Sequence, residues 1–283
     1  MIPILLHFGP ITIYSYGLMV ALGFIAADLA TVSEFKRRGY DPQIVSTLVL
    51  WIAISAMVGS RILDIINNWS NYAANPISMI TPGAGFVFYG GFIGAILVSF
   101  ILARYFKIRW LTLADMCAPG IAIGHGIGRI GCQLSGDGDW GLPSNVPWAM
   151  AYRRAIVGWN GRTVVTLGPN GQLLPAPGCN DSGCEPWVRV HPAPIYETIL
   201  YTGVFLILWS LRRRLNIEGQ VFYVYLMLAG GCRFLVEFFR VNERLLLGLS
   251  EAQLIALAMV TVGAIGYFNS VFRPQLVESR RAA

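Results

Sequence analysis

Charged side chains are scarce in this chain of 283 residues, of which Asp, Glu, Lys and Arg together make up 13%. A typical soluble domain carries roughly 25%. Hydrophobic residues make up 55% of the chain, and the mean hydropathy is +0.58. The apolar residues gather in long runs instead of recurring at the period of a soluble core. This pattern excludes an ordinary soluble enzyme and is typical of a membrane protein.

Histidine and acidic residues are also few. The three histidines (His7, His125 and His191) do not combine with the five cysteines at ligand spacing, so we expect no metal site. No nucleotide or other cofactor is implied. Acidic residues number 15 against 21 basic ones. The basic residues form short clusters between apolar runs, which favours a role in membrane topology over nucleic-acid binding. The amino terminus lacks a basic region before its apolar stretch, so we expect no removable signal peptide.

Seven apolar runs are long enough to cross a hydrocarbon core, which needs about 20 residues. Each should be helical, because lipid offers no other partner for backbone N–H and C=O groups. The predicted fold class is therefore an all-α integral membrane protein of about seven transmembrane helices, forming a single membrane domain over residues 1–283. The predicted spans are 14–32, 45–65, 86–105, 111–131, 195–211, 219–239 and 251–270.

Basic clusters predict the orientation of these spans. Three basic residues follow every odd-numbered span, whereas the loop 66–85 contains no Lys or Arg. Since basic loops stay in the cytoplasm, the amino terminus is predicted outside and the carboxyl terminus inside. The clusters are Lys36, Arg37 and Arg38; Arg104, Lys107 and Arg109; Arg212, Arg213 and Arg214; and Arg273, Arg280 and Arg281.

The segment 132–194 is then an extracytoplasmic insertion between the fourth and fifth spans. It is rich in Gly, Pro and Trp, and residues 163–174 predict two short strands around a Pro-Asn-Gly turn. A small head of mixed structure is expected, with Trp140, Trp148, Trp159 and Trp187 suited to the lipid headgroup layer. Cys179 and Cys184 could pair there if the compartment is oxidising, or remain free thiols.

Arg129 lies in a glycine-rich patch, residues 124–139, that contains a literal G-x-G-x-x-G at 126–131. A dinucleotide site is excluded, because that motif needs a preceding β-strand. Here the glycines close an apolar span. We expect them to permit close helix packing and to break the helix, exposing backbone donors beside Arg129. Such an arrangement suits a phosphate-sized anion.

Other charges within the spans allow two interpretations. Arg233 and Glu237 are one helical turn apart and can pair, so Glu237 either contributes to a site or only neutralises Arg233. Arg61 and Asp64 can pair in the same way, and we interpret that pair as structural. Asp115, near the start of a span, is also expected to be structural.

Several motifs, in order along the chain, resemble the prolipoprotein diacylglyceryl transferase family. The resemblance covers about residues 10–270. The motifs are Tyr16-Gly17-Leu18-Met19, Gly59-x-Arg61, Tyr89-Gly90-Gly91, Gly128-Arg129-Ile130-Gly131, His191-Pro192 with Tyr196-Glu197, and Arg233 to Arg240 (RFLVEFFR).

The resemblance implies an enzyme of the bacterial inner membrane that moves the diacylglyceryl group of phosphatidylglycerol onto the lipobox cysteine of preprolipoprotein signal peptides. A thioether forms and glycerol phosphate leaves. Membrane lipid and these signal peptides are the implied partners, and nucleic acid is not. The candidate catalytic residues are Arg129, Arg233, Tyr89 and Asp137, which lie in or beside these motifs, and His125, which is a separate hypothesis for this chain. The implied substrate-binding residues are Tyr16, Arg129, Arg233, Gly136, His191, Tyr196 and Glu237.

The sequence departs from the common family pattern in two places. Tyr89 stands where many members carry His, and a phenol, which titrates near 10, is a poor base. Many members have Asn-x-x-Asn-Gly-Glu where this chain has the segment that begins at Cys132 and ends at Asp137. The acid is retained as Asp137, whereas the two asparagines are replaced by Cys132 and Ser135. His125, one turn before Arg129, either replaces the missing imidazole as the base or only forms hydrogen bonds within the bundle.

Two other classes of protein remain open. A transporter would use the intramembrane charges as an ion path, although the chain shows no internal repeat. A non-catalytic lipid-binding scaffold would explain Tyr89 and Cys132 as signs of lost function. Point variants separate these, since an enzyme loses turnover while its fold stays intact.

Overall fold

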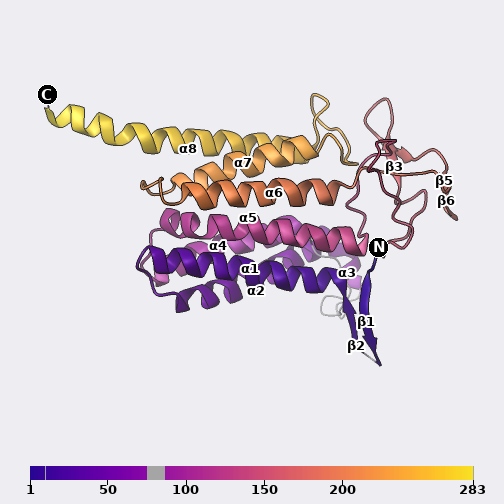
Figure 1. The fold of residues 1–283 in the computed structure, drawn as a ribbon, viewed down its shortest axis with the longest axis horizontal. Helices are drawn as coiled ribbons and strands as arrows, with labels where there is room; N and C mark the ends of the chain where they lie inside the picture. The colour runs from indigo at the N-terminus through magenta and orange to yellow at the C-terminus, as the bar shows by residue number, and fades with distance from the viewer. Residues whose placement is uncertain (10, 75–86, 283) are drawn as a thin grey trace. The chain divides into compact units, whose positions relative to one another are not determined.

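The computed structural model describes residues 1–9, 11–74 and 87–282, and within them the chain is mostly helical (Figure 1). Eight helices are present in these residues, and three two-stranded hairpins accompany them. The helices are α1 (Ser15–Arg37), α2 (Gln43–Asn67), α3 (Trp69–Ala74), α4 (Phe88–Tyr105), α5 (Trp110–Ser135), α6 (Ala193–Leu211), α7 (Gln220–Val236) and α8 (Glu251–Ala282). The strands are β1 (Ile4–Phe8), β2 (Ile11–Tyr14), β3 (Val165–Leu167), β4 (Leu173–Pro175), β5 (Cys179–Asn180) and β6 (Gly183–Cys184).

Within the described ranges, four helical stretches are long and apolar enough to cross a membrane, and two shorter apolar helices accompany them. The four are Ser15–Arg37, Gln43–Asn67, Ala193–Leu211 and Glu251–Phe272, and the shorter two are Tyr89–Tyr105 and Gln220–Val236. The predicted run 111–131 falls inside α5. The chain is thus a mostly helical, multi-pass membrane protein.

The prediction of an all-α fold is wrong in its detail, because three hairpins are present. The β3–β4 hairpin confirms the strands predicted within residues 163–174. The β1–β2 hairpin, which precedes α1, was not predicted. Its residues are as apolar as those of a span, so hydropathy alone does not separate them from the helix that follows.

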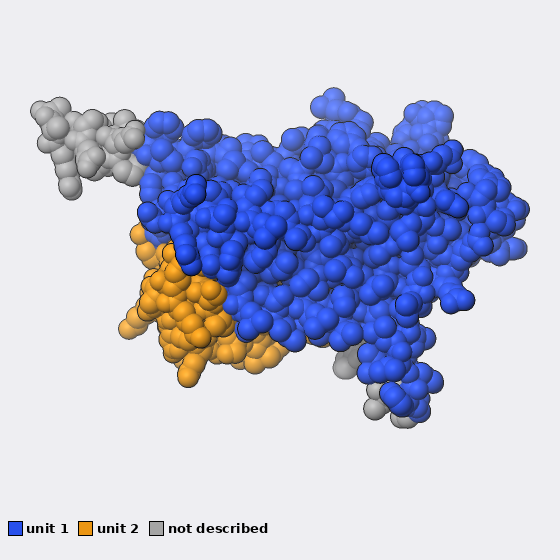
Figure 2. Space-filling model, viewed as in Figure 1, with its two compact units in different colours: residues 1–30, 115–283 blue, residues 31–114 orange. Residues whose placement is uncertain are grey.

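The chain divides into two compact units, residues 1–30 with 115–283 and residues 31–114 (Figure 2). In the first unit α1 crosses α5 where two glycines meet: a Cβ added at Gly23 would lie 2.9 Å from the Gly124 carbonyl oxygen. A Cβ at Gly131 would lie 3.0 Å from Met19 Cβ. The predicted use of glycine for close helix packing is confirmed here.

Asp115 has a structural role, as expected, but it stabilises the start of α7 and not that of its own helix, α5. Its two carboxylate oxygens accept the backbone N–H groups of Gly219 and Phe222, each at 2.8 Å. These donors belong to the first turn of α7, which has no intrahelical acceptors of its own. Asp115 therefore caps α7 and connects it to α5.

In the second unit the predicted Arg61–Asp64 pair is confirmed. Arg61 Nη1 lies 3.1 Å from Asp64 Oδ2. The hydroxyl of Tyr72 donates to the same carboxylate oxygen at 2.6 Å and accepts from Arg61 at 3.0 Å. The pair is thus part of a local network that joins α2 to α3.

The head is built on buried aromatic rings, which corrects one expectation. Trp140 and Trp159 are 2% and 8% exposed and pack in the head core, with ring centroids 5.2 Å apart. Trp148 and Trp187 are exposed, as an interfacial residue would be. Cys179 and Cys184 form a disulfide that joins β5 to β6. Composition had indicated the lipid interface for all four tryptophans, but two of them supply the hydrophobic area that so small a head needs.

The predicted helix break at residues 126–131 is wrong, because α5 continues without interruption to Ser135. Neighbouring helices occupy the space beside Gly126 and Gly131, and this packing outweighs the cost of about 1 kcal/mol that each glycine adds relative to alanine. The helix ends where Gly136 adopts a left-handed φ of 63°. The Gly136 N–H donates to the Cys132 carbonyl at 3.0 Å.

Gly136→Ala is therefore expected to destabilise the protein by about 1–3 kcal/mol. Alanine disfavours the left-handed conformation, and its Cβ would lie 2.7 Å from Ala155 Cβ. The matched control is Gly128→Ala on the same helix, where nothing lies within 4 Å of the added carbon. The midpoint of thermal unfolding in detergent checks this. Equal midpoints for the two variants would contradict it.

Candidate active site

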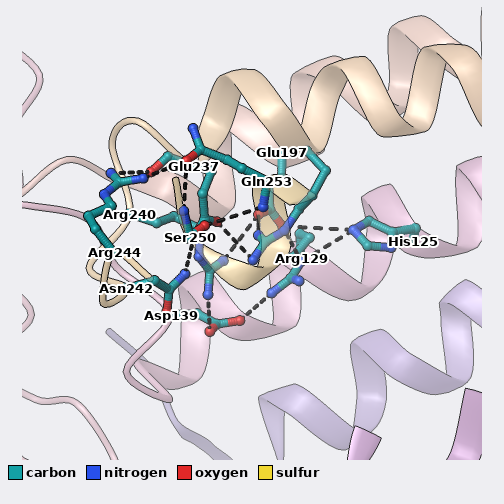
Figure 3. A network of polar contacts seen from close by, with 11 residues as sticks. His125, Arg129, Asp139, Glu197, Glu237, Arg240, Asn242, Arg244, Ser250 and Gln253 are labelled. Carbon is teal, nitrogen blue, oxygen red and sulfur yellow. Dashed lines mark hydrogen bonds and ion pairs between the residues drawn. The ribbon is translucent and has the colours of Figure 1, made fainter. Parts of the chain in front are cut away.

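One buried carboxylate, Glu197 in the first turns of α6, holds three guanidinium groups (Figure 3). Its Oε1 accepts from Arg233 Nη1 at 3.0 Å and from Arg240 Nη1 at 3.1 Å. Its Oε2 forms an ion pair with Arg129 Nε. Glu197 is 1% exposed. Three cations from α5, from α7 and from the segment after α7 are thus brought around one acid.

Asp139, in the first residues of the head, is a second bridging acid. Its Oδ1 accepts from Arg240 Nη2 at 2.6 Å, and its Oδ2 is paired with Arg129 Nη1. Burial alone would raise the pKa of Asp139, but the positive charges of Arg240 and Arg129 outweigh it and hold the pKa below its ordinary value. Asp139 is therefore ionised at neutral pH. Arg129 and Arg240 are thus each held by two carboxylates, those of Asp139 and Glu197.

Glu237, at the end of α7, holds the third arginine. Its Oε2 lies 2.9 Å from Arg233 Nη2, which confirms the predicted pairing. Its Oε1 accepts from Asn242 and from the Ser250 hydroxyl, the latter at 2.7 Å. Ser250 also begins α8 in a reciprocal cap with Gln253. Glu237 is completely buried, so it connects Arg233 to the start of α8.

The cluster balances three guanidinium groups against three carboxylates. A guanidinium has five N–H donors, and these ion pairs do not use all of them. The side chains of Arg129 and Arg233 are 21% and 26% exposed, whereas Arg240 is 11% exposed. Arg129 and Arg233 can therefore offer donors to an anion while the carboxylates keep them in place. Such fixed donors stabilise charge that develops on oxygen.

Comparison with known proteins covers nearly the whole chain. The sequence profile of the family described as prolipoprotein diacylglyceryl transferase matches residues 3–269. The chain belongs to this family. Its relatives include the phosphatidylglycerol–prolipoprotein diacylglyceryl transferase of Geobacter sulfurreducens, which is 32% identical over 92% of each chain. The corresponding transferase of Dehalococcoides mccartyi is 30% identical, over 94% of this chain and 92% of its own. That of Clostridium tetani is 29% identical, over 96% of this chain and 99% of its own.

His125 of the transferase lies beside the cluster. Its Nε2 is 3.4 Å from Arg129 Nε and 3.7 Å from Glu197 Oε2. Its ring stacks on that of Tyr201, with centroids 3.8 Å apart. The side chain is 34% exposed. The contacts fit both interpretations of His125, since the stacked ring fills space while the Nε2 atom reaches the charged groups.

Asp137 adjoins the cluster without joining it. Its Oδ1 accepts the backbone N–H of Asp139 at 3.3 Å. Carboxylate oxygens of Asp137 and Asp139 and the Sγ of Cys132 lie within 4.8 Å of one another. Among the described residues, Arg129 and Arg240 each form ion pairs with Asp139 and with Glu197, whereas Asp137 forms none. Asp139, two residues further along the chain, is the acid of this segment that pairs with the arginines. A catalytic role for Asp137 stays a prediction.

Three more of the predicted residues, Tyr16, His191 and Tyr196, lie in the first compact unit. Tyr16 on α1 approaches α5 beside Gly131, where an added Cβ would be 3.4 Å from the Tyr16 ring. His191 Nδ1 lies 3.0 Å from the Tyr196 hydroxyl, which also accepts from Trp148. Tyr196 directly precedes Glu197, so this polar aromatic group adjoins the cluster. Burial lowers the pKa of His191, which therefore stays neutral at pH 7.

Tyr89 belongs to the second compact unit, in the first turn of α4, where it is 41% exposed. The guanidinium cluster belongs to the first unit. A catalytic role for Tyr89 stays a prediction.

Sequence reasoning missed the roles of Glu197, Asp139 and Arg240. Arg240 carried a usable signal, because Arg233, Glu237 and Arg240 follow the i, i+4, i+7 spacing of one helical face. Glu197 stood within a recognised motif without an assigned partner. Asp139 had no local signal, since its partner Arg240 is 101 residues away.

Asp139→Asn is expected to lower kcat/KM for transfer by about 10- to 100-fold, because Arg129 and Arg240 lose the charge that fixes them. The matched control, Asp137→Asn, is expected to stay within about threefold of wild type, because Asp137 fixes no arginine. Since the Asp139 pKa is lowered, its contribution to stability is complete above the unfolded value near 3.9 and is lost as pH falls through the folded value. The initial rate of transfer at pH 7 is the measurement. A larger loss of rate for the Asp137 variant than for the Asp139 variant would contradict this expectation and support the catalytic role predicted for Asp137.

Proposed function

We propose that Arg129, Arg233 and Arg240 form the site at which this transferase holds the phosphate of phosphatidylglycerol and releases it as glycerol phosphate. As a member of its family, the chain is a phosphatidylglycerol–prolipoprotein diacylglyceryl transferase. The observation that carries the site assignment is the convergence of three guanidinium groups on Glu197, two of them partly exposed.

The reaction forms one bond and breaks one. The cysteine thiol loses its proton, its sulfur attacks the glyceryl carbon that bears the phosphate ester, and the carbon–oxygen bond to phosphate breaks. The departing phosphate gains negative charge as this bond lengthens. Guanidinium donors that are already oriented stabilise that charge without having to reorganise. Arg129 and Arg233 are the proposed contacts, because their side chains are the more exposed ones.

The acids of the cluster are proposed to position the arginines. Glu197 and Asp139 hold Arg129 and Arg240, and Glu237 holds Arg233 from a fully buried place. Fixing the donors in advance reduces the entropy lost when the lipid binds. Glu237 thus affects the lipid through Arg233.

Four further residues are proposed to surround the substrates. Tyr16 lies on α1 beside Gly131, and His191 and Tyr196 form the polar aromatic group before Glu197. Gly136 ends α5 with a left-handed φ, so its contribution would be to direct the chain into the head.

We propose His125 as the group that takes the thiol proton. A free thiol has a pKa near 8.5, so a neighbouring base raises the fraction of thiolate at pH 7. His125 is an imidazole whose Nε2 reaches the charged cluster. The alternative is that His125 only forms hydrogen bonds within the packed bundle, where its ring also stacks on Tyr201.

His125→Gln is expected to lower kcat/KM at pH 7 by about 100-fold. The deficit should shrink between pH 7 and 9, because hydroxide then supplies the thiolate. A packing role would lower stability without this change in the pH profile. The rate of Tyr89→Phe, which keeps the ring and removes the hydroxyl, is measured at the same pH values for comparison. Full activity of the His125 variant at pH 7 would reject the base assignment.

The finer topology is also a proposal. Seven spans are proposed, with the amino terminus outside, the carboxyl terminus in the cytoplasm and the head of residues 132–194 outside. The basic cluster after each odd span supports this orientation. The Cys179–Cys184 disulfide supports an oxidising compartment for the head. We further propose that the whole chain functions as one membrane domain of the bacterial inner membrane, acting on the lipobox cysteine of signal peptides.

The direct test mixes purified protein, labelled phosphatidylglycerol and a lipobox peptide. Label is expected on the peptide cysteine as a thioether, with release of glycerol phosphate. If folded protein that binds the lipid transfers no label, the proposal is wrong and a non-catalytic scaffold is favoured. Substrate flux across liposomes without transfer would instead indicate a transporter.

A further inference from the structure

A basic cavity of about 210 Å³ lies at the connection between α4 and α5, entirely within the second compact unit. Three cations line it together with apolar and aromatic groups, and none of the described residues that line it is acidic. The lining residues are Phe100, Ala103, Arg104, Lys107, Ile108, Arg109 and Trp110. None of these residues belongs to the guanidinium cluster, so the proposed phosphate site does not explain the cavity.

A tight turn brings the three cations to one rim. Arg104 lies in the last turn of α4, and α5 begins at Trp110. Lys107 adopts a left-handed φ of 56°, and its N–H donates to the Arg104 carbonyl at 3.2 Å. Glycine or asparagine would suit that conformation better. The chain thus keeps a cation at a strained backbone position, as ligand-binding turns often do.

Two of the three cations at this rim lack an acidic partner in the described part of the chain. Arg104 and Lys107 are exposed, and neither forms an ion pair with an acidic side chain in the described part of the chain. The amino terminus of α5, the positive end of its helix dipole, adjoins the same turn. An anion is therefore the ligand that the electrostatics favour.

A rigid aromatic wall completes the cavity. Phe100 and Trp110 stack with centroids 4.4 Å apart and planes 7° from parallel. The Trp110 indole N–H donates to the Ser99 hydroxyl at 2.9 Å, which fixes the ring. Aromatic rings of this kind concentrate at the level of lipid headgroups.

An apolar stripe leads along α4 to the cations. Leu97, Ile101 and Tyr105 are spaced by four residues and are 57%, 64% and 76% exposed. Such spacing places them on one face of the helix. A free phosphate would make no contact with this apolar stripe, whereas the acyl chains of a lipid would cover it. The occupant that fits both features is an amphipathic anion.

We propose that this cavity binds the phosphate headgroup of an anionic phospholipid, whose acyl chains lie along the exposed face of α4. The basic residues interact with the headgroup, and the stacked Phe100 and Trp110 support it from the side. Basic pockets at the cytoplasmic end of spans bind acidic headgroups in this way. The site does not depend on the transfer reaction, because it shares no residue with the guanidinium cluster.

The test uses full-length protein in detergent with added phosphatidic acid, and native mass spectrometry counts the bound lipids. Arg104→Gln with Lys107→Asn removes two charges, and asparagine tolerates the left-handed backbone. This variant is expected to bind one phosphatidic acid fewer than wild type, or to bind it at least about tenfold more weakly. The matched control is Arg213→Gln with Arg214→Gln, which removes two exposed charges elsewhere. It should bind as wild type does.

Three further measurements complete the design. The Arg104/Lys107 variant should keep its transfer rate within about twofold of wild type, because neither residue belongs to the guanidinium cluster. Arg129→Gln should keep its phosphatidic acid at the α4–α5 site, which separates this proposal from the active-site assignment. Phosphatidylcholine should not replace phosphatidic acid there. Identical phosphatidic acid binding by wild type and the Arg104/Lys107 variant would overturn the proposal. Displacement of the bound phosphatidic acid by an equal concentration of inorganic phosphate would also overturn it, because the acyl chains would then contribute nothing to binding.

Discussion

Arg129→Gln is expected to lower kcat/KM for diacylglyceryl transfer by about 10²- to 10³-fold, the usual cost of losing a donor that stabilises developing charge. Arg129 contacts both bridging acids, Glu197 and Asp139, so its guanidinium is fixed on two sides while part of it stays exposed. The loss should fall mainly on kcat, because the charge on phosphate grows as the ester bond breaks.

Two controls sharpen the Arg129 prediction. Arg129→Lys keeps the charge but not the planar fork, and it should recover little of the rate. Arg162→Gln removes an arginine whose partner Asp181 is 70% exposed in the head, and it should leave the rate unchanged. Initial rates of thioether formation measure all three. A wild-type rate for Arg129→Gln would remove the phosphate site from this cluster.

Glu197→Gln is expected to have the largest effect on stability, about 3–5 kcal/mol, together with loss of transfer. The carboxylate is 1% exposed, and three guanidinium groups converge on it. Removing the negative charge leaves these cations close together without the carboxylate charge that they share. The midpoint of thermal unfolding in detergent should fall well below that of wild type.

A double variant tests whether this loss is electrostatic. Glu197→Gln with Arg240→Gln removes one charge of each sign, so it should recover part of the lost stability. Asp181→Asn, which breaks an exposed pair, should change the midpoint little. If the double variant is no more stable than Glu197→Gln alone, charge balance is not what Glu197 supplies.

The helices could be predicted from the sequence because lipid leaves the backbone few choices. Apolar runs of about 20 residues must be helical, and each predicted run coincides with a helix in the described residues. The ends were less predictable. The glycines of α5 predicted a break that packing against Gly23 and Tyr16 prevents, and the helix continues to Ser135.

The site was predictable where its contacts are local in sequence. Arg233 and Glu237 are one turn apart, and that spacing indicated their pairing. The contacts of Asp139 with Arg240 and of Glu197 with Arg129 join residues far apart in the chain. No periodic pattern encodes such contacts. Asp137 was chosen because it occupies the familiar motif position, although the acid two residues later is the one that meets the arginines.

The central claim is that Arg129 and Arg233 hold the departing phosphate, and binding of glycerol phosphate tests it most directly. Calorimetry on purified protein in detergent would compare wild type with Arg129→Gln, Arg233→Gln and the control Arg162→Gln. The account predicts binding by wild type and the control, weakened at least about tenfold in each cluster variant. Equal affinity in all four proteins would contradict it, because the phosphate would then be held elsewhere.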